Sequence, residues 1–547
     1  MAVLNALATP PRRIAGVNWR SVGIPIALIV GAVAVWAAIT AVVGATTIPY
    51  PWSIIATMID DWPLLWDNTT STLYTAVCGL LAAVVVTTVL GAVSFALPFS
   101  RPVVVSLATV VHVIPIAAVA PIVVVAAEPE MARIIVAALL VYFPLLIGVL
   151  LGLNSVDTRA MDVITASGGG SWAQLRRVRF ASALPHIIAG LQIGVPAAVV
   201  GAMLGEFFGS EEGLGAILLV AQQQFFVNRV WAIGLLAGLI ATAGFGLVTL
   251  VARIAVPWAG EDVTVGTSVA GGAGHRLGPA KTVLAAVASF VLIIGFWYSL
   301  RYVFGFDSYF VRTPDEVIRF MISGDPNGVA AASSLTDRGG PTGFWGSFRT
   351  ALGQTIVHAA VGFVCGIVVA VLAAIMAVAA PSVGRPFTAV ATVVRSIPLL
   401  AMTPVIVLVF GRGLIAVTVI IVLITFFPTM VNVIAGLRGA PATTGDVIRA
   451  SGGRNVDVAR YTQLLYSVPS IIASVRIAVP AAISGAMLAE WLATGDGVGY
   501  MIALASVHGQ YLQLWTVSAL MVVLVLILYG LLGAISAVIS RRIGIAD

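Results

Sequence analysis

The feature that most constrains this chain is a series of apolar runs, each of roughly 20 residues. An apolar run of about 20 residues can cross a bilayer as one helix. The runs are continuously apolar rather than alternating, which excludes the strand pattern of a membrane β-barrel. We therefore expect an all-α polytopic membrane protein of about 12 helices. The predicted helices cover residues 23–46, 72–97, 103–127, 131–153, 184–206 and 230–256, then 283–304, 350–379, 387–410, 412–436, 468–489 and 513–539.

The composition agrees with a lipid-facing surface. Hydrophobic residues make up 60% of the chain and charged residues 9%, whereas soluble domains carry about 25% charged residues. The first apolar run is too long for the core of a signal peptide, so we expect a retained helix. The two cysteines, Cys78 and Cys365, lie inside apolar runs and indicate no disulfide framework.

Positive charge is concentrated in loops on one side of the predicted bundle. Cytoplasmic loops of membrane proteins carry an excess of Lys and Arg. We therefore expect a multi-pass protein of the bacterial cytoplasmic membrane, with both termini in the cytoplasm. The arginines that support this orientation are Arg12, Arg13, Arg159, Arg176, Arg177, Arg179, Arg438, Arg449, Arg454, Arg460, Arg541 and Arg542.

The chain repeats itself at a spacing of 284 residues. Asp162-Val-Ile-Thr-Ala-Ser-Gly-Gly returns as Asp446-Val-Ile-Arg-Ala-Ser-Gly-Gly, and Gly201-Ala-Met-Leu-Gly-Glu206 returns as Gly485-Ala-Met-Leu-Ala-Glu490. Nearer the N-terminus the spacing falls to 283, where Thr72 matches Thr355, and then to 263, where Pro51 matches Pro314. Such self-similarity indicates two homologous units. Because each unit has an even number of helices, both have the same orientation.

The repeat divides the chain into three segments. The first unit covers residues 1–257, a linker covers 258–282, and the second unit covers 283–547. The linker is rich in Gly and polar residues, which suits a flexible connector. An insertion around Gly324–Phe344 in the second unit is predicted to be an outer loop.

The loop after the fourth helix of each unit resembles the EAA loop of binding-protein-dependent ABC importer permeases. It spans about 154–183 in the first unit and about 437–467 in the second. In the family motif a Glu is followed by Gly and later by Ile-x-Leu-Pro. Asp162 and Asp446 occupy the Glu position, while Ala181 and Leu465 replace the proline.

A second segment, Arg395-Ser-Ile-Pro-Leu-Leu-Ala-Met-Thr-Pro404, is similar to permeases for nitrate, sulfonate, taurine and bicarbonate. Permeases for thiamine-pyrimidine precursors and riboflavin look similar too. The resemblance covers nearly all of both units and implies the type I importer fold. It also implies that a short helix in each EAA loop docks into an ATPase subunit. The coupling residues so implied are Asp162, Ala166, Ser167, Gly168, Gly169, Asp446, Ala450, Ser451, Gly452 and Gly453.

The residues of this loop alone also indicate a segment that binds a partner. It is cytoplasmic, amphipathic and basic, and its Ser-Gly-Gly step allows the backbone bend that a presented helix needs. The alternative is an ordinary basic loop that only obeys the charge rule for cytoplasmic segments. Two matched copies favour a partner-binding loop.

The chain carries no nucleotide site of its own. A P-loop requires Gly-Lys-Ser/Thr, but the single lysine, Lys281, follows Ala280. We find no metal-ligand spacing and no catalytic constellation. The chain is therefore predicted to be a non-catalytic subunit without cofactors, while two ABC ATPase subunits bind ATP and Mg. The other expected partners are membrane lipid and a periplasmic or lipid-anchored solute-binding protein, with no role for nucleic acid.

Polar side chains inside predicted helices are candidates for the solute path, because they are costly in a bilayer. The glutamates could instead be interfacial or cap helices, and Arg476 could extend toward the cytoplasm. The candidates are His112, Gln192, Arg395, Arg476, Glu206 and Glu490. Arginines facing the path would favour a small anion such as a sulfonate, taurine or nitrate, whereas Glu490-Trp491 resembles the vitamin-precursor branch.

Two other classes remain open from the residues alone. An ion-driven secondary transporter can have two parallel six-helix halves, but it needs no duplicated cytoplasmic loop and should keep a membrane-buried acid. A channel or a structural membrane protein is the third possibility, although nothing resembles a selectivity filter. Co-purification with an ATPase separates the first class from the other two.

Overall fold

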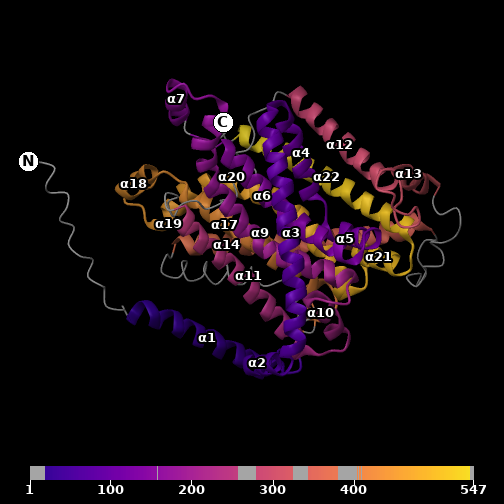
Figure 1. Ribbon diagram of the computed structural model, residues 1–547. Helices are drawn as coiled ribbons and strands as arrows, with labels where there is room; N and C mark the ends of the chain where they lie inside the picture. The colour runs from indigo at the N-terminus through magenta and orange to yellow at the C-terminus, as the bar shows by residue number, and fades with distance from the viewer. Residues whose placement is uncertain are drawn as a thin grey trace, which may run out of the picture.

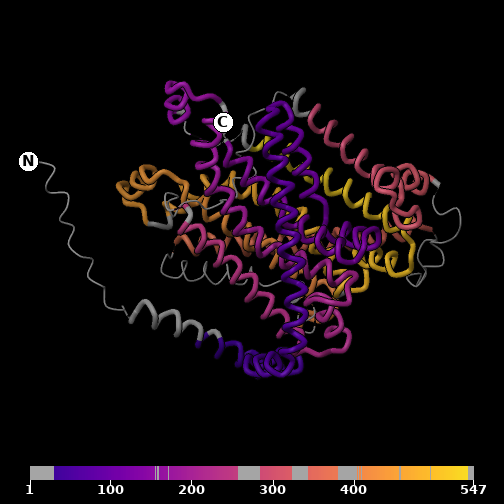
Figure 2. Tube along the Cα trace, viewed as in Figure 1, coloured from indigo at the N-terminus to yellow at the C-terminus, as the bar shows by residue number. Residues whose placement is uncertain are grey.

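The computed structural model describes residues 19–154, 156, 158–256, 279–323, 343–379, 403, 406–407 and 409–542 (Figure 2). The regular elements within these residues are all helices (Figure 1). The first half contains α1 (Trp19–Val43), α2 (Pro51–Asp60), α3 (Trp62–Ala96), α4 (Arg101–Val113), α5 (Ile116–Ala126), α6 (Pro129–Asn154), α7 (Thr158–Ala166), α8 (Ser171–Gln174), α9 (Phe180–Gly209), α10 (Leu214–Gln223) and α11 (Val227–Ala255).

The second half follows the same order. It contains α12 (Pro279–Tyr302), α13 (Pro314–Ser323), α14 (Phe344–Ala379), α17 (Leu414–Arg438), α18 (Ala442–Ala450), α19 (Asn455–Val458), α20 (Leu464–Ala489), α21 (Gly497–Val507) and α22 (Tyr511–Arg542). Short π-helical turns join some of these elements, at Leu175–Arg179, Ala459–Gln463 and Glu490–Thr494.

Within the described residues, nine helices are long and apolar enough to cross a membrane. They correspond to nine of the predicted twelve. The predicted first helix coincides with α1, whose segment Val33–Val43 is apolar. The predicted ninth helix, 387–410, lies largely outside the described residues. These observations agree with a polytopic protein of about twelve helices.

The third predicted helix, 103–127, is broken into two helices in the structure. The chain breaks between α4 and α5, which are bent by 92°. Ile114 has extended backbone angles (φ −61°, ψ 126°) immediately before Pro115. A proline ring disfavours helical angles in the residue before it, and it supplies no N–H for the helix to continue.

The second predicted helix begins earlier than expected. The sequence predicts a start at residue 72, but α3 starts at Trp62. The added turns carry polar residues, among them Asp67, Asn68 and Thr69, which are unusual in a membrane span. Thr69 is buried, so this stretch packs inside the helical bundle rather than forming a loop.

Each half is built on the same three-helix core. In the first half α6 packs against α9 and α3, and in the second α17 packs against α20 and α14. Close approach is possible because small residues face the neighbour. A Cβ on Gly201 would lie 2.7 Å from Ala137 Cα, and one on Gly205 would lie 2.8 Å from Arg133 Cα. These glycines therefore mark helix packing, as the spacing of small residues indicates.

The two halves interlock through helices that cross between them (Figure 1). The first helix of the second half, α12, packs on α4 of the first half, where Ser289 Oγ donates to Val103 O at 3.3 Å. In return α5 packs on α20, α21 and α22, and Ser518 Oγ donates to Ala118 O at 2.9 Å.

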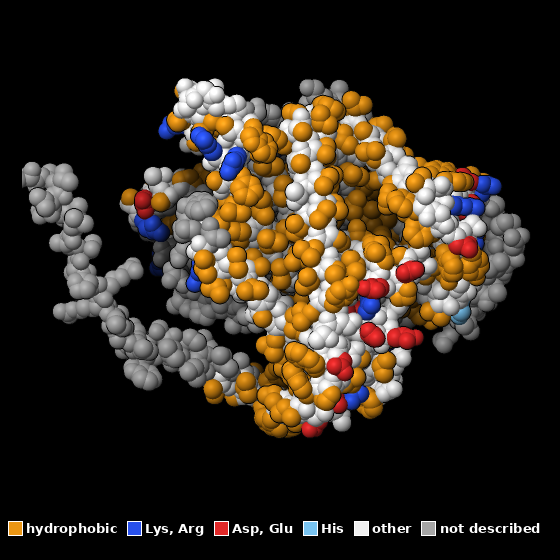
Figure 3. Space-filling model, viewed as in Figure 1, with side chains coloured by type: hydrophobic (Ala, Val, Ile, Leu, Met, Phe, Trp, Pro, Cys, Tyr) orange, Lys and Arg blue, Asp and Glu red, His pale blue; other side chains and the backbone are white. Residues whose placement is uncertain are grey.

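Charge separates along the molecule. On the face seen in Figure 3, Lys and Arg gather around α7 and α18, Asp and Glu predominate around α10 at the opposite end of the helices, and both kinds occur around α13. The sides of the bundle between these ends are largely hydrophobic. Large apolar side chains such as Leu81, Val85 and Val89 on α3 are exposed there. This is the pattern expected of a bundle surrounded by lipid.

Candidate functional site

The predicted coupling loop of the first half is a pair of short helices, α7 and α8, joined by the Ser-Gly-Gly step. Gly168 adopts a left-handed backbone (φ +77°). Its N–H donates to Thr165 O at 3.0 Å, and the Gly169 N–H donates to Ile164 O at 2.8 Å. These two bonds form a Schellman motif, which ends a helix with a left-handed residue.

The second half repeats this motif. Gly452 has φ +83°, its N–H donates to Arg449 O at 3.0 Å, and the Gly453 N–H donates to Ile448 O at 2.9 Å. The geometry agrees with the backbone bend expected at the first glycine. It also gives the second glycine a separate role, because a Cβ on Gly453 would lie 2.5 Å from Ile448 Cγ2.

The two loops present different side chains. In the first, Trp172 is 74% exposed, and Gln174 Nε2 donates to Thr165 Oγ1 at 2.9 Å. In the second, an exposed ion pair joins Arg449 and Asp446 at 3.0 Å. Asp162 and Asp446 are both exposed, so each copy keeps an accessible carboxylate at the motif position.

Glu206 is a fully buried helix cap rather than a free carboxylate. Its Oε2 accepts hydrogen bonds from Thr72 Oγ1 and from the Gly215 N–H, both at 2.9 Å. Thr72 Oγ1 in turn accepts the Leu214 N–H at 2.8 Å, and Asn68 Oδ1 accepts the Gly213 N–H at 2.8 Å. The N–H groups of the N-cap residue Gly213 and of the first two residues of α10 are thereby satisfied, as a helix N-terminus requires.

Glu490 caps α21 in the same way. Its Oε2 accepts from Thr355 Oγ1 at 2.8 Å and from the Gly499 N–H at 3.0 Å. Thr355 Oγ1 accepts the Val498 N–H at 2.9 Å, and Gln354 takes the part played by Asn68, since its Oε1 accepts the Gly497 N–H at 3.0 Å.

The glycines beside these carboxylates leave them room. Gly213 has φ +105° and Gly497 has φ +80°, and a Cβ on either would lie 2.2 Å from the glutamate Cδ. The geometry supports the helix-cap interpretation of Glu206 and Glu490 over a place on the solute path. A carboxylate that holds a helix end is also poorly placed to carry ions across a membrane.

Gln192 and Arg476 occupy equivalent positions and both face the last helix of their own half. Gln192 Nε2 donates to Thr249 Oγ1 on α11 at 3.1 Å. Arg476 lies over the ring of Tyr529 on α22, with 4.4 Å from Cζ to the ring centroid. A Cβ on Gly533, which matches Thr249, would lie 3.4 Å from the guanidinium. Both side chains thus join the fifth and sixth helices of their halves.

His112 lies at the break between α4 and α5. Its ring stacks on Phe143 of α6, with centroids 3.7 Å apart and planes 6° apart, and the side chain remains exposed. Of the six path candidates it is therefore the exposed one among the described residues. Its counterpart, Arg395, lies outside the described residues.

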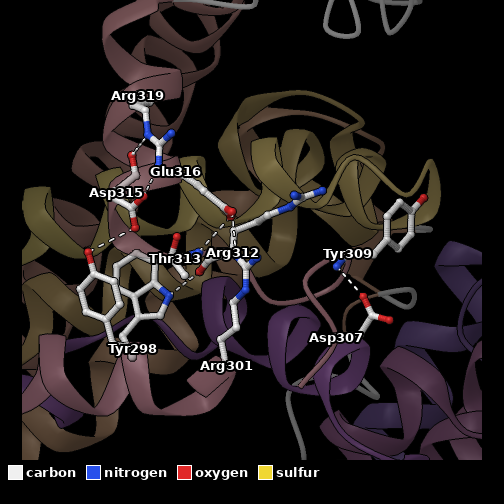
Figure 4. Close-up of polar contacts among 10 residues, drawn as sticks. Tyr298, Arg301, Asp307, Tyr309, Arg312, Thr313, Asp315, Glu316 and Arg319 are labelled. Atoms are coloured by element: carbon white, nitrogen blue, oxygen red, sulfur yellow. Dashed lines mark hydrogen bonds and ion pairs between the residues drawn. The ribbon is translucent and has the colours of Figure 1, made fainter. Parts of the chain in front are cut away.

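A polar corner joins α12 to α13 in the second half (Figure 4). Arg301 Nη1 donates to Glu316 Oε1 at 2.7 Å, and Tyr298 OH donates to Asp315 Oδ1 at 3.2 Å. Hydrogen bonds to the Asp315 carboxylate lower its pKa to about 2. The largest contribution comes from the hydroxyl of Thr313, and the next from Arg319. Among the described side chains no ion pair joins α1 to α2, whose only charged residue is Asp60 at its end.

Both corners nevertheless share a tryptophan that sequence comparison did not reveal. Trp297 Nε1 donates to Arg312 O at 2.7 Å, and its ring stacks on Trp515. Trp36 Nε1 donates to Pro49 O at 3.1 Å, and its ring lies 5.0 Å from Trp231. Trp36 and Trp297 are 261 residues apart in the sequence, whereas the repeat spacing at Pro51 and Pro314 is 263. This further change in spacing hides the match between the two tryptophans.

One protein family matches the chain in both halves, and curated relatives match part of it. The family described as "Binding-protein-dependent transport system inner membrane component" matches residues 89–257 and 362–545. A riboflavin transport system permease protein of Chloroflexus aurantiacus is 30% identical over 26% of this chain and 54% of its own length. A formylaminopyrimidine transport permease protein of Halalkalibacterium halodurans is 29% identical over 28% and 61%.

A protein named for aliphatic sulfonates transport, from Bacillus subtilis, is 29% identical over 27% of this chain and 54% of its own length. The matches thus span between half and two thirds of these three relatives. No solved structure matches the chain. Within the described residues, no group of His, Cys, Asp and Glu is arranged to hold a metal ion.

Proposed function

This chain belongs to the family of binding-protein-dependent transport system inner membrane components, and on that basis we propose that it passes a small solute inward, from a binding protein, at the expense of ATP hydrolysed by partner subunits. ABC transporter permeases are the membrane subunits of transport systems whose ATPase subunits are separate. The observation that carries the proposal is the duplicated pair α7/α8 and α18/α19. Both pairs have the same Schellman motif, and both continue through a π-helical turn into the fifth helix of their half.

Two ATPase subunits are the proposed partners on that side. Each would receive one loop, with Asp162 to Gly169 in the first half and Asp446 to Gly453 in the second. Both halves are in one chain, so one copy of the chain would serve the two ATPase subunits. ATP and Mg would be bound by those partners. The Arg-rich end around α7 and α18 fits a cytoplasmic location, and both termini would lie there.

The solute is proposed to carry a planar ring, of the pyrimidine or flavin type. Arg476 was a candidate to attract a small anion, but its guanidinium lies over Tyr529 within the protein. Relatives named for riboflavin and formylaminopyrimidine point the same way. A small anion such as a sulfonate is the second candidate, favoured by the relative named for aliphatic sulfonates.

The secondary-transporter alternative loses its main support in the geometry. It requires a membrane-buried acid that is free to bind and release an ion. The two acids that sequence reasoning offered, Glu206 and Glu490, each accept hydrogen bonds from a helix N-terminus. To carry an ion, either glutamate would have to break its hydrogen bonds to the helix N-terminus in every transport cycle.

Purification of the tagged chain from its native membrane tests the proposal. We expect an ATPase with a P-loop to co-purify, and uptake of the solute by the reconstituted complex to require ATP. Gly168→Trp with Gly452→Trp should lower both ATPase stimulation and uptake, while the binding protein still holds its ligand. Uptake driven by an ion gradient, without ATP or an ATPase, would contradict the proposal. Competition by riboflavin, a pyrimidine and taurine separates the two solute classes.

A further inference from the structure

Two aromatic residues at the same position of the repeat touch each other across the halves. Phe207 follows Glu206, and Trp491 follows Glu490, at the 284-residue spacing. Their rings meet edge to face, with centroids 5.2 Å apart and planes 87° apart. When two equivalent residues touch, the pseudo-two-fold axis that relates the halves passes close to their contact.

A third ring closes this contact. Phe208 stacks on Trp491, with centroids 4.2 Å apart and planes 19° apart, and it meets Phe207 edge to face. Phe207 is 2% exposed. Trp491 also packs, with Leu488 and Leu492, against the core of the first half. The axis is therefore filled by apolar side chains at this level.

Each half fixes its ring through the preceding glutamate, which caps the N-terminus of a neighbouring helix. Glu206 is bonded to the N-terminus of α10, and Glu490 to the N-terminus of α21. In the second half the helix widens into a π-helical turn at Glu490–Thr494. Such turns are rare and often occur at functional sites. The two halves thus present unlike rings from equivalent, fixed positions.

We propose that Phe207, Phe208 and Trp491 form the outer seal of the solute path. The inference rests on the proposed function, in which a solute passes between the two halves. The rings lie at the end of the molecule opposite the coupling helices, where α9 and α20 end. A solute that enters there must part Phe208 from Trp491, so the seal opens only when the halves separate at their outer ends.

A leak assay on the purified chain tests the seal without any ATPase or solute. The chain is reconstituted in liposomes with a trapped pH-sensitive dye, and proton flux is driven by a potassium gradient with valinomycin. Trp491→Ala and Phe208→Ala should raise the leak several-fold above wild type. Trp297→Ala is the matched control, because Trp297 stacks on Trp515 away from the axis, and its leak should equal wild type.

Trp491→Leu keeps an apolar side chain, so it tests the seal if the alanine variants do not fold. Gel filtration identifies the folded variants. A folded Trp491→Leu or Trp491→Ala variant that leaks no more than Trp297→Ala would overturn the proposal. Because the leak needs no partner, this outcome is independent of whether an ATPase co-purifies.

Cross-linking gives a second, geometric test. Cys78 and Cys365 are replaced by serine, and Phe207→Cys is combined with Trp491→Cys. A short bifunctional methanethiosulfonate reagent, which bridges thiols too far apart for a direct disulfide, should join the pair within one chain, and the bridge should abolish ATP-driven uptake by the complex until a reductant is added. Either single-cysteine variant should be unaffected by the reagent. If the pair does not cross-link, or if the cross-linked complex transports normally, the two positions do not form the seal.

Discussion

His358 Nδ1 lies 3.0 Å from Glu490 Oε1, inside the second half of the protein. A carboxylate can only accept, so the imidazole nitrogen is the donor. At the matching place in the first half the sequence has Thr75, and Glu206 Oε1 has no hydrogen-bond partner among the described residues. The two caps are alike at Oε2 and differ at Oε1.

Replacing His358 by alanine should weaken the second half. Glu490 Oε1 would lose its partner, and an unsatisfied buried polar group costs about 1–3 kcal/mol. The measurement is thermal unfolding of the purified protein in detergent, followed by tryptophan fluorescence. His508 is exposed, so His508→Ala is the control and should unfold with the wild type. Equal midpoints for the two variants would show that the His358 contact contributes nothing.

Glu206 should tolerate glutamine but not alanine. Both hydrogen bonds to this cap end on Oε2, and the amide oxygen of glutamine can accept both. Alanine would leave the Gly215 N–H without its acceptor, at a cost of about 1–3 kcal/mol. The readouts are thermal unfolding and solute uptake, with exposed Glu211→Ala as the control. Loss of uptake in a stable Glu206→Gln protein would instead indicate a proton-carrying acid.

Gly215 should not accept even one methyl group. A Cβ there would lie 2.0 Å from the carbonyl oxygen of Met203, which belongs to a helix backbone and cannot turn away. We expect Gly215→Ala to reduce the yield of folded protein sharply. In Gly353→Ala the Cβ meets no atom within 4 Å, and alanine favours a helix by about 1 kcal/mol. Similar yields of the two variants in gel filtration would contradict the packing described.

The first glycine of each coupling loop should matter for its backbone angles rather than for space. Gly168 and Gly452 have open surroundings but positive φ, where an L-residue costs roughly 1–2 kcal/mol. Gly168→Ala with Gly452→Ala should lower ATPase stimulation while the spans stay folded. Gly170 has neither close neighbours nor positive φ, so Gly170→Ala is the control. Undiminished stimulation in the double variant would argue against a rigid coupling bend.

Arg476 should be replaceable by the pair found in the first half. Arg476→Gln alone removes the contact with Tyr529, worth about 0.5–2 kcal/mol. Adding Gly533→Thr recreates the Gln192–Thr249 bond and should restore stability. Solute uptake at normal protein levels should survive in the double variant, as measured in whole cells. If uptake is lost while stability is restored, the arginine serves the solute after all.

The sequence was informative where one repeat copy could be checked against the other. The Ser-Gly-Gly bend recurs at Gly168 and Gly452, and the small residues at Gly201 and Gly205 are spaced for helix packing. Such features depend on residues a few positions apart. Their geometry follows from local backbone rules, so the structure agrees with what the spacing predicts.

The helix break at Pro115 could not be read from proline alone. Pro144 lies inside α6, and Pro185 and Pro196 lie inside α9, without ending either helix. What differs at Pro115 is where the following helix packs, because α5 turns away from α4 and packs on the second half. Likewise the partner of Glu206 is Thr72, 134 residues away. Long-range packing of this kind leaves no periodic trace in the sequence.

The packing of α12 on α4 has a consequence for how the chain is made. Synthesis proceeds from the N-terminus, and earlier parts fold first. When α12 leaves the ribosome, α4 has already been inserted, so the second half begins its assembly on a surface that the first half provides. The face of α5 that packs on α20, α21 and α22 stays uncovered until those helices are synthesised. The fused chain therefore sets the order of assembly, which two separate subunits would have to find by collision.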